Sequence, residues 1–428
     1  MPKAKVTPGL ALRLAAADRL QAVLGGASFA PLTAAELADP RDRAVANRLV
    51  TTALRYHGPI SALVKSLLER GMPKKSGRFA AVLHLSLAQL LFLPDLGDHS
   101  ALFLAGEAMR ADPKTQHLIK LMNGVLREAQ RRRSGVEVDA SALFPETLLT
   151  TWRAAYGDAA VDAFGRALLD GAPLDLTLKA GDPGLADAAP VLADTVRVTD
   201  RDRAVDQLPG FAEGRFWVQD AAAAIPARLL KLPAGSRVLD LCAAPGGKTA
   251  QLVKAGYEVT ALDRDPARVE RLAQNLKRLD YRPALVTADA LDYQPETLFD
   301  GVLLDAPCSA TGTFRRHPEV VWHRNPADIA GRVDIQRRLL ARATACLKPG
   351  GVLIYCVCSL EPDEGEAQAA WALAQGELEL LAVAAEELDG WAAPVTKDGV
   401  VRTHPGLTVP GEKGGTLDGF FIARFRRR

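Results

Sequence analysis

The chain has 428 residues, of which 48% are hydrophobic and 24% are charged. This length predicts two or three domains, and the composition excludes a mainly disordered chain, a collagen-like chain and a small disulfide-stapled domain. The formal net charge of +2 hides an asymmetry that indicates an anion-binding module, because residues 1–135 carry 20 Lys and Arg against 10 Asp and Glu while the rest sums to −8.

The first part of the chain has the apolar spacing of helices. Apolar residues recur every three or four positions within residues 10–24, 45–56 and 118–126, and residues 79–93 are apolar almost throughout. Short connections separate these segments, and no strand pattern or catalytic cluster interrupts them. Residues 1–135 are therefore predicted to form an all-helical domain.

The sequence predicts a cytoplasmic protein without a membrane span. Arg13, Asp18 and Arg19 interrupt the N-terminal apolar stretch, which fits neither a signal peptide nor a membrane helix. All five cysteines lie between Cys242 and Cys358, so a secreted disulfide framework would leave more than half the chain unstapled. Their spacing matches no zinc motif, and no metal site is predicted.

Residues 136–215 are predicted to form a linker and a small subdomain that precedes the catalytic part. Gly, Asp and Ser residues interrupt any helical stripe in residues 134–145. Residues 144–169 then have a helical pattern, and residues 174–179 and 195–198 alternate as short strands do.

Strands alternate with helices from residue 216 to the C-terminus. The predicted strands are the short apolar runs at residues 238–241, 259–262, 284–286, 302–304 and 352–355. Helical patterns at residues 266–279 and 329–346 separate some of these runs. Such alternation is typical of a parallel sheet with helices on both faces, so residues 216–428 are predicted to form an α/β Rossmann-like domain.

The first predicted strand leads into a loop of small residues. The loop consists of Cys242, Ala243, Ala244, Pro245, Gly246, Gly247 and Lys248. Small residues at a strand-to-helix turn allow the backbone to approach a ligand closely. Asp263, Asp289 and Asp305 end the next three strands, where carboxylates line the ligand crevice of a doubly wound sheet, and Asp263 suits ribose hydroxyls.

Four interpretations of this loop compete. A P-loop is supported by Gly247-Lys248-Thr249, but Cys242 stands where the first glycine belongs. A dinucleotide site requires G-x-G-x-x-G, which the loop lacks. A site for S-adenosylmethionine needs partners for a ribose and an amino group but no diphosphate cradle, and the strand-end aspartates favour it. The fourth interpretation is a plain tight turn.

Two cysteines follow neighbouring strands. Cys308 lies just after the fourth strand, in Asp305-Ala306-Pro307-Cys308-Ser309, and Cys358 closes the fifth. Because parallel strands end at the same edge, both thiols are expected to face one pocket. Cys346 and Cys356 are interpreted instead as core residues, which is the usual role of a buried cysteine.

A thiol beside a methyl donor suggests methylation of a pyrimidine. Carbon 5 of the ring is a poor nucleophile until a thiolate adds to carbon 6 and converts the ring to an enamine. After methyl transfer, a base removes the carbon 5 proton and the thiol leaves. The Asp305 carboxyl could hydrogen-bond the ring nitrogen and favour the addition.

These motifs resemble those of the NOL1/NOP2/Sun family of RNA cytosine-5 methyltransferases. The similarity rests on residues 239–249, Asp263, residues 305–309 and residues 355–359, and residues 418–425 look like the family's final strand. The resemblance implies an S-adenosylmethionine methyltransferase fold.

The helical N-terminus is similar to the NusB antitermination domain. Residues 42–50 and 121–126 carry this similarity. A NusB-like domain joined to such a catalytic domain resembles the bacterial Sun-type enzymes, which implies 16S ribosomal RNA as the substrate.

The resemblance to the family also implies a role for each residue of the predicted site. Cys358 is the implied nucleophile, and Cys308 would help to release the product. S-adenosylmethionine would be held by residues 242–248 together with Asp263, Asp289 and Asp305. Lys248 would reach into the active site. Two residues depart from the family pattern: Val357 replaces the usual Thr before the nucleophile, and Ala288 stands where a Gly is common.

Arg315 and Arg316 are candidate RNA contacts. They follow the turn that carries Cys308, and guanidinium groups beside the pocket suit RNA phosphates. A solvated loop is the alternative interpretation. The target cytosine must leave its stack or lie in a loop to reach Cys358.

The sequence therefore predicts S-adenosylmethionine-dependent methylation of carbon 5 of a cytosine in 16S ribosomal RNA, free or in an early subunit precursor, through a covalent cysteine adduct. A transfer-RNA or large-subunit-RNA methyltransferase is an alternative that the NusB-like domain disfavours. A non-catalytic RNA-binding or antitermination factor is disfavoured by the presence of Cys308, Cys358 and Asp305, and a P-loop ATPase by Cys242.

Overall fold

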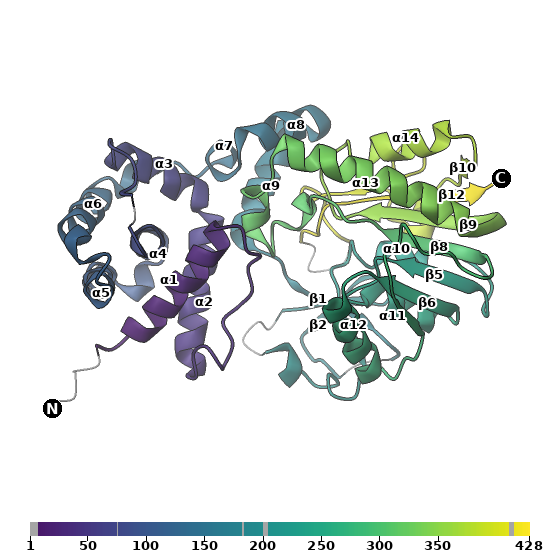
Figure 1. The fold of residues 1–428 in the computed structure, drawn as a ribbon, viewed down its shortest axis with the longest axis horizontal. Coiled ribbons are helices and arrows are strands. Elements are labelled where there is room, and N and C mark those ends of the chain that lie inside the picture. The colour runs from purple at the N-terminus through teal and green to yellow at the C-terminus, as the bar shows by residue number, and fades with distance from the viewer. Residues whose placement is uncertain (1–6, 75, 182–183, 200–203, 411–414) are drawn as a thin grey trace. The chain divides into compact units, whose positions relative to one another are not determined.

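The computed structural model describes residues 7–74, 76–181, 184–199, 204–410 and 415–428 (Figure 1). The chain divides into two compact units. The first contains Met1–Thr150, Phe164–Leu169 and His317–His323, and the second contains Thr151–Ala163, Asp170–Arg316 and Arg324–Arg428. The sequence predicted three segments, whereas the predicted small subdomain, residues 136–215, is divided between the two units.

The first unit is helical, as predicted. Its described helices are α1 (Leu10–Leu24), α2 (Pro40–Arg55), α3 (His57–Leu67), α4 (Phe79–Phe92), α5 (Asp98–Ala111), α6 (Ile119–Arg131) and α7 (Ala140–Leu143). Helix α4 is apolar on all sides and therefore buried along most of its length. It contacts α1, α2, α3, α5 and α6, and Figure 1 shows it end-on among them. The core of this unit is built around α4.

Two helices span the boundary between the units. They are α8 (Glu146–Tyr156) and α9 (Asp158–Asp170). The sequence pattern predicted one helical stretch over residues 144–169, but Gly157 adopts a positive φ of 80° and separates the two helices. Glycine is the residue that tolerates this conformation best, which makes it a common helix terminator.

A small antiparallel sheet precedes the large one in the second unit. Its strands are β1 (Leu174–Leu178), β2 (Ala188–Leu192), β3 (Thr195–Val198) and β4 (Phe216–Val218), in the order β2-β3-β1-β4. The predictions of β1 and β3 are confirmed. Strand β2 contains Pro190, which lacks an N–H donor, and it occupies an edge of the sheet, where proline is tolerated.

The large sheet has a parallel centre and antiparallel strands on one side. Its strands are β5 (Arg237–Leu241), β6 (Glu258–Asp263), β7 (Ala284–Thr287), β8 (Phe299–Asp305), β9 (Leu347–Val357), β10 (Leu378–Leu380), β11 (Val401–Thr403) and β12 (Phe420–Arg427). Strands β9-β8-β5-β6-β7 are parallel neighbours. Strand β12 runs antiparallel to β9, and β10 and β11 pair with β12. This arrangement confirms the predicted α/β Rossmann-like fold.

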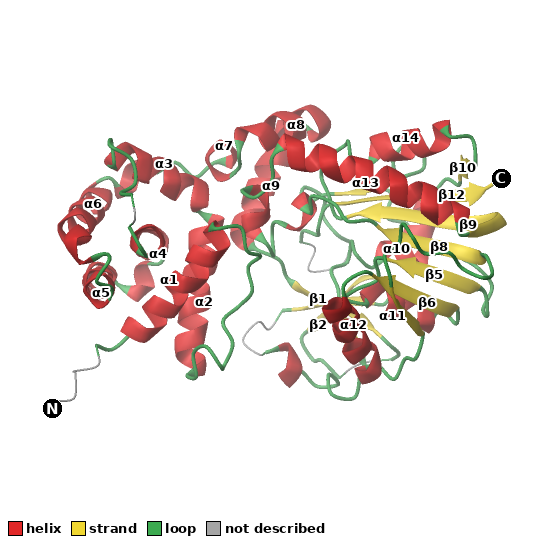
Figure 2. Ribbon diagram, in the orientation of Figure 1, coloured by secondary structure: helices red, strands yellow, loops and turns green. Residues whose placement is uncertain are grey.

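Helices cover both faces of the large sheet. They are α10 (Ile225–Arg228), α11 (Gly247–Lys254), α12 (Pro266–Arg278), α13 (Pro326–Ala345) and α14 (Glu366–Ala374) (Figure 2). Side chains of a strand alternate between its faces. Val302 and Leu304 accordingly share a core with α13 and α14, whereas Leu303 shares the opposite core with α10 and α11. No helix among the described residues is both long and apolar enough to cross a membrane.

Three helices begin with the same capping arrangement. An Asp or Asn side chain accepts a backbone N–H of the first turn, and a proline follows at once: Asp39 before α2, Asp265 before α12 and Asn325 before α13. Proline lacks an N–H that the first turn would leave unpaired, and each such cap stabilises its helix by about 1 kcal/mol.

The chain order of the strands creates a crevice. After β5 the chain forms β6 and β7 on one side, and it then crosses to form β8 and β9 on the other side. The switch point lies between β5 and β8, and ligands of open α/β sheets bind at the carboxyl ends of the strands at such a point.

Candidate active site

The loop between β5 and α11 lies at this switch point. Gly246 adopts a positive φ of 105°, and a side chain there would overlap Leu272, so the turn requires glycine. Asp263 accepts a hydrogen bond from the Ala244 N–H at 3.2 Å, and Arg268 donates one to the Ala244 carbonyl at 2.6 Å. The backbone of the predicted cofactor loop is therefore held from β6 and α12.

Two of the three predicted carboxylates contact this loop, Asp263 at the Ala244 N–H and Asp305 at Lys248. Asp263 is only 2% exposed at the end of β6, and Asp305 lies at the end of β8. Asp289 follows β7, is exposed and accepts a hydrogen bond from the Leu291 N–H at 2.8 Å. Burial, with added repulsion from nearby carboxylates, raises the pKa of Cys242 to about 12. Cys242 therefore remains a neutral thiol in the wall of the crevice.

Asp240 is a further carboxyl group of this crevice that the sequence analysis did not identify. It is fully buried on β5 and accepts a hydrogen bond from the Thr249 hydroxyl at 2.6 Å. Its other oxygen, Oδ1, has no hydrogen-bond partner among the described residues. The sequence contained a signal for this buried carboxyl group, because an acidic residue stands between Leu239 and Leu241 within an apolar strand. Buried carboxylates, one with an orphaned oxygen, beside a glycine turn suit a cationic ligand better than a diphosphate.

Replacing Asp240 with asparagine is expected to change how stability depends on pH. Burial, with added repulsion from Asp305, raises the Asp240 pKa from 3.8 to about 7. The folded state therefore binds this proton more tightly than the unfolded state, so part of the free energy of unfolding is lost as pH rises from about 4 to about 7. Asp240→Asn keeps an acceptor for Thr249 and removes the titration.

Urea unfolding at pH 5 and pH 7.5 checks this expectation. The difference between the two midpoints should be smaller in Asp240→Asn than in the wild type. An identical pH dependence in both proteins would show that Asp240 does not titrate as its burial implies.

An ion pair joins the start of α11 to the end of β8, from which the chain continues to Cys308. Lys248 Nζ lies 2.8 Å from Asp305 Oδ2 and 5.2 Å from the centre of the Phe420 ring. Burial alone would lower the Lys248 pKa, but Asp305 and the nearby thiols raise it above its usual value. Cys356 also donates a hydrogen bond to Asp305 at 3.5 Å. The charged ammonium holds Asp305 at the edge of the sheet.

The two predicted thiols lie together. Strand β9 ends at Val357, so Cys358 lies just outside it, and Asp305 and Cys356 pair in the parallel register of β8 and β9. The Sγ atoms of Cys308 and Cys358 are 3.5 Å apart. The two thiols therefore lie side by side, and the pocket that both are expected to face stays a prediction.

The surroundings of the two thiols differ. Cys308 is 8% exposed, whereas Cys358 is half-buried. The hydrogen bond with Cys358 and burial raise the Cys308 pKa well above its usual value, and the charge of Glu364 adds to the effect. Cys308 is therefore a protonated thiol. Cys346 and Cys356 are buried in the cores on either face of the sheet, as predicted.

The prediction that Arg315 contacts RNA is wrong. Its side chain is 1% exposed, and Nη2 lies 2.6 Å from Asp220 and 2.7 Å from Asp418. The guanidinium is thus committed to two buried carboxylates that lie far away in the sequence. Arg316 also pairs with Asp418, but 38% of its side chain is exposed, so its contact with RNA stays a prediction.

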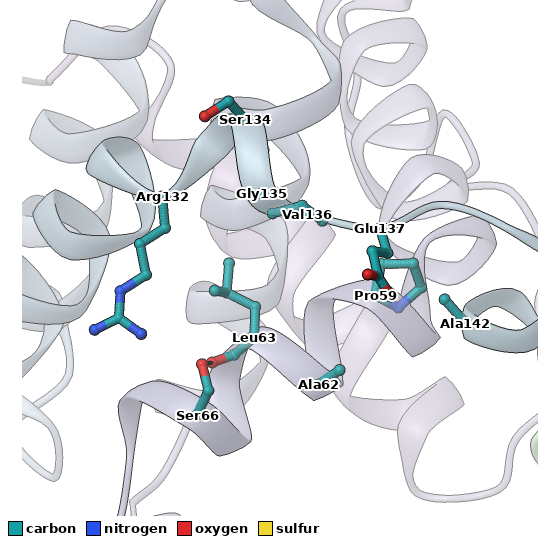
Figure 3. Close-up of a pocket in the computed structure, with 10 residues that line it drawn as sticks. All are labelled: Pro59, Ala62, Leu63, Ser66, Arg132, Ser134, Gly135, Val136, Glu137 and Ala142. Atoms are coloured by element: carbon teal, nitrogen blue, oxygen red, sulfur yellow. Dashed lines mark hydrogen bonds between the residues drawn. The ribbon is translucent and has the colours of Figure 1, made fainter.

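A cavity of about 520 Å³ opens in the helical unit and not at the thiols (Figure 3). It lies beside α3 and the segment that follows α6, with Leu63, Arg132 and Glu137 among the residues that line it. Its walls contain no thiol or other strong nucleophile. Among the described residues, no group of three or more His, Cys, Asp or Glu side chains could hold a metal ion.

Comparison with known proteins finds a family match in each of the two units. The profile of the 16S rRNA methyltransferase RsmB/F family matches residues 227–426, and that of the NusB family matches residues 11–131. The chain is 40% identical over 388 residues to "Ribosomal RNA small subunit methyltransferase B" of Xanthomonas campestris pv. campestris, which covers 84% of this chain and 87% of the relative.

Solved structures share the fold. The crystal structure of a protein named PH0851 matches with a TM-score of 0.80 over 99% of this chain and 100% of that chain, at 21% identity. A methyltransferase homologue from Pyrococcus horikoshii matches with a TM-score of 0.55 at 26% identity, over 67% of this chain and 96% of that chain.

Proposed function

Because the chain belongs to the 16S rRNA methyltransferase RsmB/F family, we propose that it methylates carbon 5 of a cytosine in 16S ribosomal RNA through a covalent cysteine adduct. Membership of this family makes the chain an S-adenosylmethionine-dependent rRNA methyltransferase. The choice of cytosine and of carbon 5 is supported above all by one observation. Two thiols lie 3.5 Å apart beside the Lys248–Asp305 ion pair.

The loop and its carboxylates form the cofactor site in this proposal. The backbone of residues 242–248 would hold S-adenosylmethionine, and Asp263, Asp289 and Asp305 would contact its polar groups. S-adenosylmethionine, when bound, supplies an electrophilic methyl group on a sulfonium cation. Asp240 Oδ1 has no hydrogen-bond partner among the described residues and Asp263 is buried beside it, which favours a cation at this position.

Cys358 acts as the nucleophile. Its thiolate forms a bond to carbon 6, and the electrons of the carbon 5–carbon 6 double bond then make carbon 5 nucleophilic. As charge develops on the ring nitrogen, the nitrogen takes up the proton that the thiol has lost. The Asp305 carboxylate, held by Lys248 at 2.8 Å, can then accept a hydrogen bond from this N–H and favour the addition. Cys358 is the more accessible thiol of the pair, which is what attack on an RNA base requires.

Cys308 assists the release of the product. Once carbon 5 carries the methyl group, a base removes its proton, the double bond reforms and the bond from carbon 6 to Cys358 breaks. The leaving sulfur takes the bonding electrons and becomes a thiolate. Because Cys308 is protonated and its sulfur lies 3.5 Å away, it can donate a hydrogen bond to this thiolate and stabilise it.

The helical unit would bind the RNA. Residues 1–135 carry a net charge of +10, and a basic surface binds phosphates without reading sequence. The exposed part of Arg316 would contribute beside the thiols. A NusB-family domain favours small-subunit ribosomal RNA over transfer RNA as the substrate, either free or in an early subunit precursor, and this substrate places the enzyme in the cytoplasm.

The substrate assignment is tested with labelled S-adenosylmethionine and total RNA from a strain that lacks the gene. We expect label to appear as 5-methylcytosine in 16S ribosomal RNA, measured by nuclease digestion and chromatography after the RNA species are separated. RNA from the parent strain is the matched control and should accept little label, because its site is already methylated. Label in transfer RNA alone, or in a base other than cytosine, would contradict the proposal.

A further inference from the structure

One buried carboxylate connects the two turns that carry the thiols. Ser309 follows Cys308, and Ser359 follows Cys358. Glu364 is 0% exposed and accepts hydrogen bonds from the Ser309 N–H at 2.8 Å, from the Ser309 hydroxyl at 2.5 Å and from the Ser359 hydroxyl at 2.5 Å. The serine that follows each cysteine thus donates a hydrogen bond to the same carboxylate.

Glu364 is itself held from two directions. Gln336 on α13 donates to its carboxylate at 3.0 Å and to the Pro307 carbonyl at 3.1 Å. The Tyr355 hydroxyl, from β9, donates to the Glu364 carbonyl at 2.7 Å. The carboxylate thus accepts from two turns and a helix, and the carbonyl of the same residue accepts from a strand, so Glu364 has little freedom to move.

The neighbouring buried carboxylate, Glu361, has different partners. It accepts hydrogen bonds from Trp152 at 2.9 Å and from the Thr311 hydroxyl at 3.1 Å. Among the described hydrogen bonds, those from the side chains of both Ser309 and Ser359 converge on Glu364 and not on Glu361.

We propose that Glu364 is a positioning residue, which fixes the separation of the Cys308 and Cys358 sulfur atoms by holding Ser309 and Ser359 together. This inference rests on the proposed function, in which a methylated adduct on Cys358 is released with the help of Cys308. Glu364 has a second effect on the pair, because its charge contributes to the raised pKa of the Cys308 thiol. It therefore favours the protonated form that the release step uses.

Glu364→Gln is the sharpest test, because it keeps the shape of the side chain. An amide group replaces one acceptor oxygen with a donor and removes the charge. The new donor would oppose the N–H groups of Ser309 and Gln336 at one oxygen position, or would force both serine hydroxyls to turn and accept at the other. The first readout needs no RNA: diamide oxidises two neighbouring thiols to a disulfide and is itself reduced to the hydrazide. We expect the rate of Cys308–Cys358 disulfide formation, followed by mass spectrometry, to fall at least fivefold in the variant.

The control variant is Asp175→Asn. Asp175 is a buried carboxylate on β1 that pairs with Arg197 at 2.7 Å, so its loss weakens the same unit without touching the thiol turns. We expect it to react with diamide at the wild-type rate. Alkylation of Cys308 should begin at lower pH in Glu364→Gln than in the wild type, which a purely structural role would not produce.

Activity gives the remaining readouts. Single-turnover methyl transfer to RNA should fall about tenfold or more in Glu364→Gln, while S-adenosylmethionine affinity changes less than twofold. If Glu364→Gln does not fold, the double variant Ser309→Ala/Ser359→Ala should show the same slow disulfide formation. Wild-type diamide rates in either folded variant would overturn the inference. If the wild-type protein fails to methylate RNA but its disulfide rate still depends on Glu364, the proposed function falls and the positioning role stands.

Discussion

Replacing Cys358 with alanine is expected to abolish methyl transfer while leaving S-adenosylmethionine binding intact. Without the sulfur, no bond forms to carbon 6 and carbon 5 stays a poor nucleophile. The side chain lies beyond the end of β9, whereas the predicted cofactor loop follows β5. We expect the rate to fall on the order of 10⁴-fold or more, as for other enzymes that lose their nucleophile.

Transfer of labelled methyl groups to 16S ribosomal RNA measures the loss, and equilibrium binding of labelled S-adenosylmethionine measures what is retained. Cys346→Ala is the matched control, since it removes a thiol buried in the core that includes α13 and should stay active. Cys356 is the nearest competitor for the role, at 3.5 Å from Asp305. Should Cys356→Ala or Cys308→Ala abolish transfer while Cys358→Ala does not, the nucleophile has been misassigned.

The parts of the fold that were predictable carry their structure in local patterns. Helix α4 is apolar on every side, and β5, β6 and β8 are short apolar runs, so burial alone specifies them. Strand β2 was not predicted because Pro190 disfavours a strand, and only pairing with β3 establishes it. The division into two units was not predictable from local patterns either, because it depends on contacts between segments far apart in the sequence.

The candidate site was predictable where it follows strand ends. Parallel strands deliver their carboxyl ends to one edge, so Asp305 and Cys358 could be placed together from the order of the strands alone. The predicted RNA contact of Arg315 was wrong because this side chain is buried against two aspartates that only the tertiary fold brings to it. Glu364 lies in an acidic stretch after Cys358 that resembles a solvated loop, and only the fold turns this residue inward.

The negative charge of residues 136–428 is partly explained by the candidate site. The second part of the chain is acidic overall, and two of its carboxylates, Asp240 and Asp263, are buried near the loop that follows β5. Burying these groups costs stability unless a cation compensates them. Arg268 already lies 3.4 Å from Asp263, whereas Asp240 Oδ1 has no hydrogen-bond partner among the described residues. A bound sulfonium cation would add compensation in the proposed cofactor site, and we expect S-adenosylmethionine to stabilise the protein against unfolding by mass action.

Replacing Cys308 with alanine is expected to leave the first half of the reaction intact and to block the second. Cys358 can still attack carbon 6, and the methyl group can still be transferred. The Cys308 sulfur, which lies 3.5 Å from that of Cys358, is then absent when the bond to carbon 6 must break. Because no thiol stabilises the departing thiolate, a covalent protein–RNA adduct should accumulate.

The adduct is measured as a protein band that carries labelled RNA and migrates slowly on a denaturing gel. Methyl transfer should stop at about one methyl group per enzyme, because each molecule remains attached to its product. The double variant Cys308→Ala/Cys358→Ala should form no such band, which ties the adduct to the Cys358 sulfur. If Cys308→Ala turns over normally without an adduct, the protonated neighbour is not needed for release. The raised pKa of the Cys308 thiol would then be a consequence of its hydrogen bond with Cys358 and its burial, with no role in catalysis.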